Sequence, residues 1–141
     1  MEEIKEEKLE EFKRIQEVLI KQFEPLAIIL FGSYARGTQN NDSDIDLAII
    51  SSKADKKQIF EIKQELEEIS SKDVDLVNLK DKNISEGLRY EVLMSGKVLY
   101  CLDEYKFEMY KIEKIKEYLD FNESRQNIID RIKNGGSIYG K

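Results

Sequence analysis

The chain reads Phe31-Gly32-Ser33-Tyr34-Ala35-Arg36-Gly37 and, after a short polar stretch, Ser43-Asp44-Ile45-Asp46-Leu47. A Gly-Ser pair thus follows one apolar run, and two carboxylates stand two residues apart at the start of another. Alternate residues of a strand point to the same side, so Asp44 and Asp46 are expected to project together. Two carboxylates held this close repel each other unless a cation lies between them.

The Gly-Ser pair supplies the other half of the pattern. A Gly-Ser turn that opens a short helix offers backbone N–H groups and a hydroxyl to a phosphate. Gly32 and Ser33 are therefore candidate phosphate ligands, and Asp44 and Asp46 are candidate metal ligands. These are the parts needed to handle a nucleoside triphosphate with magnesium. The alternatives are an ordinary helix cap at the Gly-Ser pair and a solvated strand end at the aspartates.

The composition excludes several classes of protein. The chain has 141 residues, a length that suits one domain with one core. Its formal net charge of -6 makes it a poor candidate for gripping a nucleic-acid backbone, so we expect no direct nucleic-acid binding. It has no histidine and a single cysteine, Cys101, which excludes a Ser-His-Asp triad and cysteine-rich zinc sites. Any general base must therefore be Asp, Glu, Lys or Tyr.

Two stretches bear on where the protein works. The N-terminus, from Met1 to Glu11, is highly charged, which argues against a secretory signal. The longest apolar run, from Leu26 to Phe31, is too short to span a bilayer. We therefore expect a cytoplasmic protein that does not associate with membranes.

The hydrophobic pattern predicts alternating helices and strands. We expect helices over about 2–23, 33–37, 55–71 and 84–94, and strands over about 26–31, 44–50, 74–79 and 97–101. Pro25 is expected to end the first helix. This order predicts a single small α/β domain in which helices pack on a sheet, with its core in residues 1–101. Periodicity alone leaves open whether the sheet is mixed.

The C-terminal part, residues 103–134, is expected to be helical, with a break near Asn122 that divides it into two helices. Residues 135–141 are expected to form a mobile tail. Five aromatic residues in this part allow two interpretations, core packing or a face that binds a partner: Tyr105, Phe107, Tyr110, Tyr118 and Phe121.

The spacing and its context resemble a known signature. A Gly-Ser pair, ten residues and Asp-x-Asp match by chance at roughly one position in 100,000 at average residue frequencies. The segment resembles the nucleotidyltransferase signature of the DNA polymerase β superfamily, over about Leu26 to Tyr100. It is most similar to the minimal nucleotidyltransferases, which include the MntA-type antitoxin partners of HEPN-domain toxins. The resemblance implies an α+β nucleotidyltransferase fold, a small mixed β-sheet packed with helices, followed by C-terminal helices.

The resemblance also implies a third carboxylate on a later strand, and Asp75 stands at the matching position. Asp73 would share its strand face and is the rival candidate. A third acid is also expected chemically, because metal ions on both sides of a transferring phosphoryl group need ligands and the attacking hydroxyl needs a base. Arg36 has two open interpretations: a contact with the triphosphate or the acceptor, or an ion pair with a nearby acid.

A specific function follows from the resemblance. It implies a magnesium-dependent enzyme, with two ions held by Asp44, Asp46 and Asp75, that uses ATP and transfers AMP to a tyrosine of a cognate HEPN toxin. The chain would then act as an antitoxin. One alternative is transfer to a small hydroxylated molecule such as an aminoglycoside. Another is a binding module that neutralises a toxin by contact alone.

Overall fold

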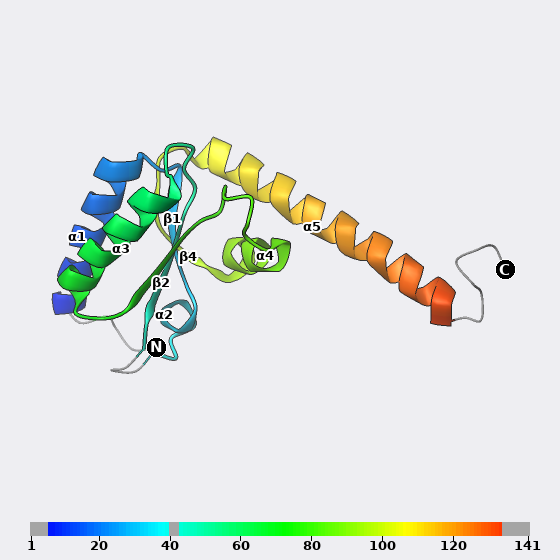
Figure 1. Cartoon of the computed structure of the whole chain (residues 1–141), viewed down its shortest axis with the longest axis horizontal. Coiled ribbons are helices and arrows are strands. Elements are labelled where there is room, and N and C mark those ends of the chain that lie inside the picture. The colour runs from blue at the N-terminus through cyan, green and yellow to red at the C-terminus, as the bar shows by residue number, and fades with distance from the viewer. Residues whose placement is uncertain (1–5, 40–42, 134–141) are drawn as a thin grey trace.

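The fold is described from a computed structural model, which covers residues 6–39 and 43–133 (Figure 1). Nine helices and strands alternate along these residues. They are α1 (Glu6–Phe23), β1 (Ala27–Phe31), α2 (Ser33–Arg36), β2 (Ile45–Ile49), α3 (Lys56–Ser70), β3 (Val74–Asn78), α4 (Glu86–Ser95), β4 (Lys97–Cys101) and α5 (Glu104–Lys133). Among the described residues, no helix has both the length and the apolar character needed to cross a membrane.

The four strands form one mixed sheet in the order β3-β2-β1-β4. The central strand β1 runs antiparallel to both β2 and β4, whereas β2 and β3 are parallel. The parallel pair is connected through α3, since parallel neighbours need a crossover rather than a hairpin. The predicted mixed sheet packed with helices is confirmed.

The sheet separates two hydrophobic cores (Figure 1). On the face covered by α1 and α3, β2 contributes Ile45, Leu47 and Ile49. On the face covered by α4 and the start of α5, it contributes Ala48 and, just beyond its end, Ile50. This alternation follows from the two-residue period of a strand, and it puts Asp46 on the α4 side of the sheet.

The predicted element boundaries agree with the structure to within two residues wherever the residues are described. Pro25 has the expected effect, because α1 ends at Phe23 and Glu24 leaves the helical conformation with φ 43°. The Glu24 N–H still donates to the carbonyl of Ile20 at 3.1 Å, which closes the helix. The predicted helix start near Glu2, part of the loop at 40–42 and the predicted tail lie outside the described residues.

The predicted break near Asn122 is wrong. The C-terminal part is one helix, α5, which runs without interruption from Glu104 to Lys133. Asparagine costs only a few tenths of a kcal/mol more than most other residues inside a helix, and no glycine or proline occurs in this stretch. The local sequence therefore has nothing strong enough to end the helix there.

The five aromatic residues of this part divide between the two interpretations. Three of them pack against the body of the protein: Phe107, Tyr110 and Tyr118. Tyr118 stacks on Tyr90 of α4 with ring centroids 4.4 Å apart. The other two, Tyr105 and Phe121, are exposed. Core packing therefore accounts for only part of the set.

A buried hydrogen-bond network ties together the ends of β2, β3 and α1. The Ser51 N–H donates to Asn78 Oδ1 at 3.1 Å, and Asn78 Nδ2 donates back to the Ser51 carbonyl at 2.8 Å. The Ser51 hydroxyl donates to the carbonyl of Phe23 at 2.7 Å. Both side chains are buried, so their polar atoms depend on these partners rather than on water.

Replacing Asn78 with alanine is expected to lower the free energy of unfolding by about 2–3 kcal/mol, because it leaves buried polar groups of Ser51 without partners. Urea unfolding of the two proteins measures the difference. Asn83→Ala is the matched control, since Asn83 is exposed and its loss is expected to cost less than about 0.5 kcal/mol. Equal effects of the two substitutions would contradict the role given to the network.

Candidate active site

The site begins where β1 ends. Gly32 follows β1 with φ 72°, in the left-handed region that favours glycine. A Cβ atom at this position would collide with the carboxylate of Asp46, which lies directly against the glycine. Glycine is therefore required at position 32 for two reasons, the positive φ angle of its backbone and the close approach of the Asp46 carboxylate.

The short helix α2 starts immediately after Gly32, and no side chain caps its first turn. The Arg36 N–H donates to the carbonyl of Gly32 at 3.2 Å, and Gly37 ends the helix with φ 71°. Ser33 is the first residue of this helix, so it stands next to the glycine that touches Asp46. The predicted phosphate ligands Gly32 and Ser33 thus adjoin the predicted metal ligands.

Contacts with Thr38 and Phe12 hold α2 in place. The N–H and the hydroxyl of Thr38 both donate to the carbonyl of Ser33, at 3.0 and 3.4 Å. The ring of Tyr34 meets the ring of Phe12 edge-on, with centroids 6.0 Å apart. Thr38 was not predicted from the sequence; the signal for it was a hydroxyl residue directly after the glycine that ends α2.

Strand pairing brings two of the three predicted aspartates side by side. Asp46 pairs with Phe31 of β1 on one side and with Asp75 of β3 on the other. Asp44 precedes β2 and lies two residues from Asp46. Asp46 is half-buried, whereas Asp44 and Asp75 are exposed. The site is therefore a group of three acids at the N-terminal ends of the parallel strands β2 and β3, and Asp46 is the least exposed of them.

The electrostatics of Asp46 reflect this arrangement. Burial raises the pKa of Asp46 above its ordinary value, and the negative charges of Asp75 and Asp44 raise the pKa further. The guanidinium of Arg36 acts in the opposite direction, so it is close enough to matter although it is exposed. A half-buried carboxylate that is repelled by two others is a place where a cation would be stabilised.

Asp73, the rival of Asp75, is placed differently. Its backbone carbonyl accepts the N–H of Ile45 at 2.9 Å, just before the paired part of β3 begins. Its charge is not among those that shift the pKa of Asp46, whereas that of Asp75 is. The register of the parallel pair therefore puts Asp75, and not Asp73, next to Asp46.

Aspartates of the site can serve as ligands of a magnesium ion that is also bound by water and substrate. No three acidic side chains of the described residues lie close enough together to enclose an ion by themselves. Magnesium usually takes one or two carboxylates and completes its shell with water and the phosphates of a substrate. Asp46 with either of its two exposed acidic neighbours would meet that requirement, so the residues present fit the ion.

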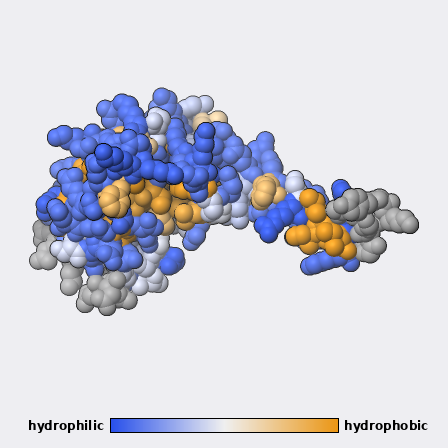
Figure 2. All heavy atoms as spheres, in the orientation of Figure 1, coloured by the Kyte–Doolittle hydropathy of each residue, from blue (hydrophilic) through white to orange (hydrophobic). Residues whose placement is uncertain are grey.

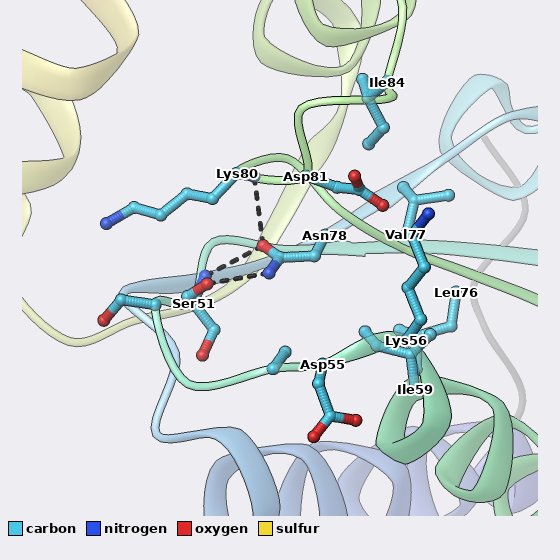
Figure 3. Close-up of a pocket in the computed structure, with 12 residues that line it drawn as sticks. Ser51, Asp55, Lys56, Ile59, Leu76, Val77, Asn78, Lys80, Asp81 and Ile84 are labelled. Atoms are coloured by element: carbon cyan, nitrogen blue, oxygen red, sulfur yellow. Dashed lines mark hydrogen bonds between the residues drawn. The ribbon is translucent and has the colours of Figure 1, made fainter.

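A separate cavity opens at the opposite end of β2 and β3 (Figure 3). It has a volume of about 680 Å³, and none of the predicted site residues lines it. Of its two acids, Asp55 accepts the N–H of Gln58 at 2.7 Å and Asp81 accepts that of Asn83 at 2.9 Å. Because both acids serve as local backbone caps, this cavity lacks the repelled carboxylates found beside Gly32.

Comparisons with known proteins find similarity to nucleotidyltransferases. The family described as "Polymerase beta, Nucleotidyltransferase" matches residues 13–105. The protein adenylyltransferase MntA of Shewanella oneidensis is 36% identical over 106 residues, which is 74% of this chain and 74% of that protein.

Solved structures of toxin–antitoxin complexes are similar as well. A crystal structure of a toxin–antitoxin with AMP-PNP contains a chain that is 32% identical, with a TM-score of 0.74 over 86% of this chain and 97% of that chain. A structure of the tri-AMPylated Shewanella oneidensis HEPN toxin in complex with MNT antitoxin contains a chain that is 30% identical, with a TM-score of 0.69 over 90% of this chain and 98% of that chain.

Proposed function

Because the chain belongs to the polymerase beta nucleotidyltransferase family, we propose that it transfers AMP from ATP to a tyrosine of a cognate HEPN toxin and thereby acts as an antitoxin. The relative from Shewanella oneidensis is a protein adenylyltransferase, and a related complex contains a HEPN toxin that carries AMP. ATP as the donor is supported by the ATP analogue AMP-PNP in another related complex. The reaction is proposed to take place in the cytoplasm.

The observation that carries the proposal is the contact between Gly32 and Asp46, with Asp75 next to Asp46 in the sheet. A phosphate held by the backbone N–H groups after Gly32 would lie beside these carboxylates. Triphosphate and carboxylates are all negative, so they can share this space only with cations between them. Asp44, Asp46 and Asp75 would hold magnesium, which when bound neutralises the charge that develops on the phosphates.

In the proposed reaction, Gly32 and Ser33 hold the β- and γ-phosphates. Asp75 accepts the proton of the tyrosine hydroxyl, whose oxygen forms a bond to the α-phosphorus. The bond from the α-phosphorus to the bridging oxygen breaks, and pyrophosphate leaves. Arg36 is exposed and positive beside Asp46, so it would contact the phosphates. The chain contains no histidine, and Asp75 is the candidate base because it stands next to Asp46 in the sheet.

The test is a transfer assay with magnesium, labelled ATP and the product of the neighbouring gene. Label on a tyrosine of that protein, located by mass spectrometry, supports the proposal. Label on aminoglycosides alone would point to a small-molecule acceptor. A tight complex without any label would point to a binding module. Removing magnesium with EDTA is expected to abolish transfer but to leave the protein folded.

Replacing Asp75 with asparagine is expected to slow transfer by about 10²-fold or more, because the proposed proton acceptor and magnesium ligand is lost while the shape of the side chain is kept. Asp73→Asn is the matched control, since it removes an equally exposed charge two residues away on the same chain segment. It is expected to change the rate by less than about threefold. The transfer rates of the two variants are compared at steady state and saturating ATP. A larger loss in Asp73→Asn than in Asp75→Asn would assign the role of base to Asp73.

A further inference from the structure

The helix α5 is longer than the body of the protein on which it packs. It has 30 residues, and its first half rests on α4 through Phe107 and Tyr118. The second half extends beyond the body, and Figure 1 shows no other described element beside it. We call residues 119–133 the overhang; at 1.5 Å per residue it is about 22 Å long.

The apolar face of α5 continues along the overhang. Phe121, Ile128 and Ile132 are separated by seven and four residues, so they lie on one side of the helix. They are 57%, 50% and 58% exposed. Their side overlaps with that of the buried Phe107, because steps of 14, 21 and 25 residues correspond to about 3.9, 5.8 and 6.9 helical turns, which leaves each within about 60° of Phe107. Figure 2 shows hydrophobic side chains gathered near the far end of α5.

An uncovered helix of this kind is not expected to be stable by itself. Most helical stability in proteins comes from packing of the apolar face, and no other described element packs on this part of α5. Exposed apolar patches of this type mark surfaces that bind another molecule. We therefore expect the apolar stripe of the overhang to be covered by another molecule.

The charges on the same segment indicate what covers it. Its beginning and the turn before it are mainly acidic, through Glu117, Asp120 and Glu123, with Lys116 as the one basic residue among them. Its end is mainly basic, through Arg131 and Lys133, with Asp130 as the one acid among them, and Arg125 lies near the middle of the segment. In an antiparallel pair, Asp120 of one helix lies level with the basic Arg131–Lys133 end of the other, whereas two parallel helices bring like charges together. Glu123 and Asp130 lie on the side of the helix away from the apolar stripe and do not take part.

We propose that the overhang is a homodimerisation surface, in which the apolar stripe of one α5 packs antiparallel against that of a second copy. Phe121 of each chain would then face the Ile128–Ile132 end of the other. The contact is short, so it is small for a protein interface and is expected to dissociate at micromolar concentrations. No predicted site residue lies on α5, so the proposal does not depend on the enzymatic activity.

The first test is the mass of the purified chain in solution. Sedimentation equilibrium over about 5–200 µM is expected to show a monomer–dimer equilibrium with a dissociation constant in that range. Replacing Ile128 and Ile132 together with aspartate is expected to leave only monomer. A wild-type chain that is monomeric throughout this range would overturn the proposal, and loss of toxin binding by the double variant would then assign the stripe to the toxin.

The second test uses charge exchange and decides the orientation. One variant carries Asp120→Lys, and the other carries Arg131→Glu, because both residues flank the apolar stripe on the same side of the helix. Each variant alone brings like charges together in the antiparallel pair, so each is expected to be monomeric. An equimolar mixture restores complementary ends and is expected to form a heterodimer.

The matched control for this exchange is Glu61→Lys with Glu65→Lys on the exposed side of α3, which is expected to dimerise like the wild-type chain. Charge variants that dimerise as well as the wild type, or a mixture that stays monomeric, would overturn the antiparallel arrangement. All of these measurements report mass rather than AMP transfer. A failure here is therefore distinguishable from a failure of the proposed function.

Discussion

Replacing Asp46 with asparagine is expected to reduce AMP transfer on the order of 10⁴-fold, because the proposal gives this carboxylate the central place among the ligands of magnesium. The same change is expected to raise the melting temperature when divalent cations are absent. It removes a negative charge that is half-buried and repelled by Asp44 and Asp75. Damage to a core residue would instead lower activity and stability together, so the two causes are easily told apart.

The higher melting temperature of Asp46→Asn is expected to depend on pH, because the pKa of Asp46 is raised in the folded protein. The folded protein holds the Asp46 proton more tightly than the unfolded chain does, so acidification favours the folded state at this residue. That contribution is complete below the pKa of an unfolded aspartate, about 3.9, and is lost as the pH rises through the raised pKa of the folded state. The advantage of Asp46→Asn is therefore largest at neutral pH and disappears toward pH 4.

Melting curves of both proteins in EDTA, recorded from neutral pH down to about pH 4, check this expectation. Acids distant from Asp46 titrate in the same window, but they are common to both proteins and cancel in the difference between the two melting temperatures. The repulsion of Asp46 by Asp44 and Asp75 does not cancel, because it is part of the effect that is measured. A difference that stays constant over this window would mean that the charge of Asp46 is not the cause. An Asp46→Asn protein with wild-type transfer activity would end the proposed assignment of this residue.

Replacing Gly32 with alanine is expected to reduce transfer on the order of 10³-fold and to destabilise the fold by about 1–3 kcal/mol. The new methyl group would occupy the position of the Asp46 carboxylate, and the backbone would have to hold φ 72° with a side chain attached. Either the carboxylate or the turn must shift. Both belong to the proposed site, so a small displacement is enough to misplace the phosphates relative to the acids.

Gly37→Ala is the matched control, because Gly37 has nearly the same backbone angle, φ 71°, but nothing within 4 Å of its missing side chain. It is expected to cost about 1 kcal/mol of stability and to leave transfer within about threefold of the wild type. Urea unfolding and steady-state rates separate the two effects. Equal losses of activity in both variants would show that backbone strain, rather than contact with Asp46, explains the requirement for glycine.

Local pattern was sufficient for most of the fold. The alternation of Ile45, Leu47 and Ile49 with polar or small residues predicted the two faces of β2, because side-chain direction in a strand depends only on counting residues. Pro25 predicted the end of α1 for an equally local reason, the steric clash of its ring with the preceding residue. The expected break near Asn122 failed because a weak local preference was treated as a strong one.

The candidate site could be predicted only in part from local sequence patterns. The order of residues along the chain was enough to place a glycine turn and an Asp-x-Asp pair on successive strands, since spacing and strand period are properties of adjacent residues. The family resemblance favoured Asp75 over Asp73, but the pairing of Asp75 with Asp46 is a property of the folded chain, because register depends on pairing between residues far apart in the sequence. Two further features were also decided only by the tertiary structure: the contact of Gly32 with Asp46 and the uncovered end of α5. Both depend on how elements that are separate in the sequence are placed in space.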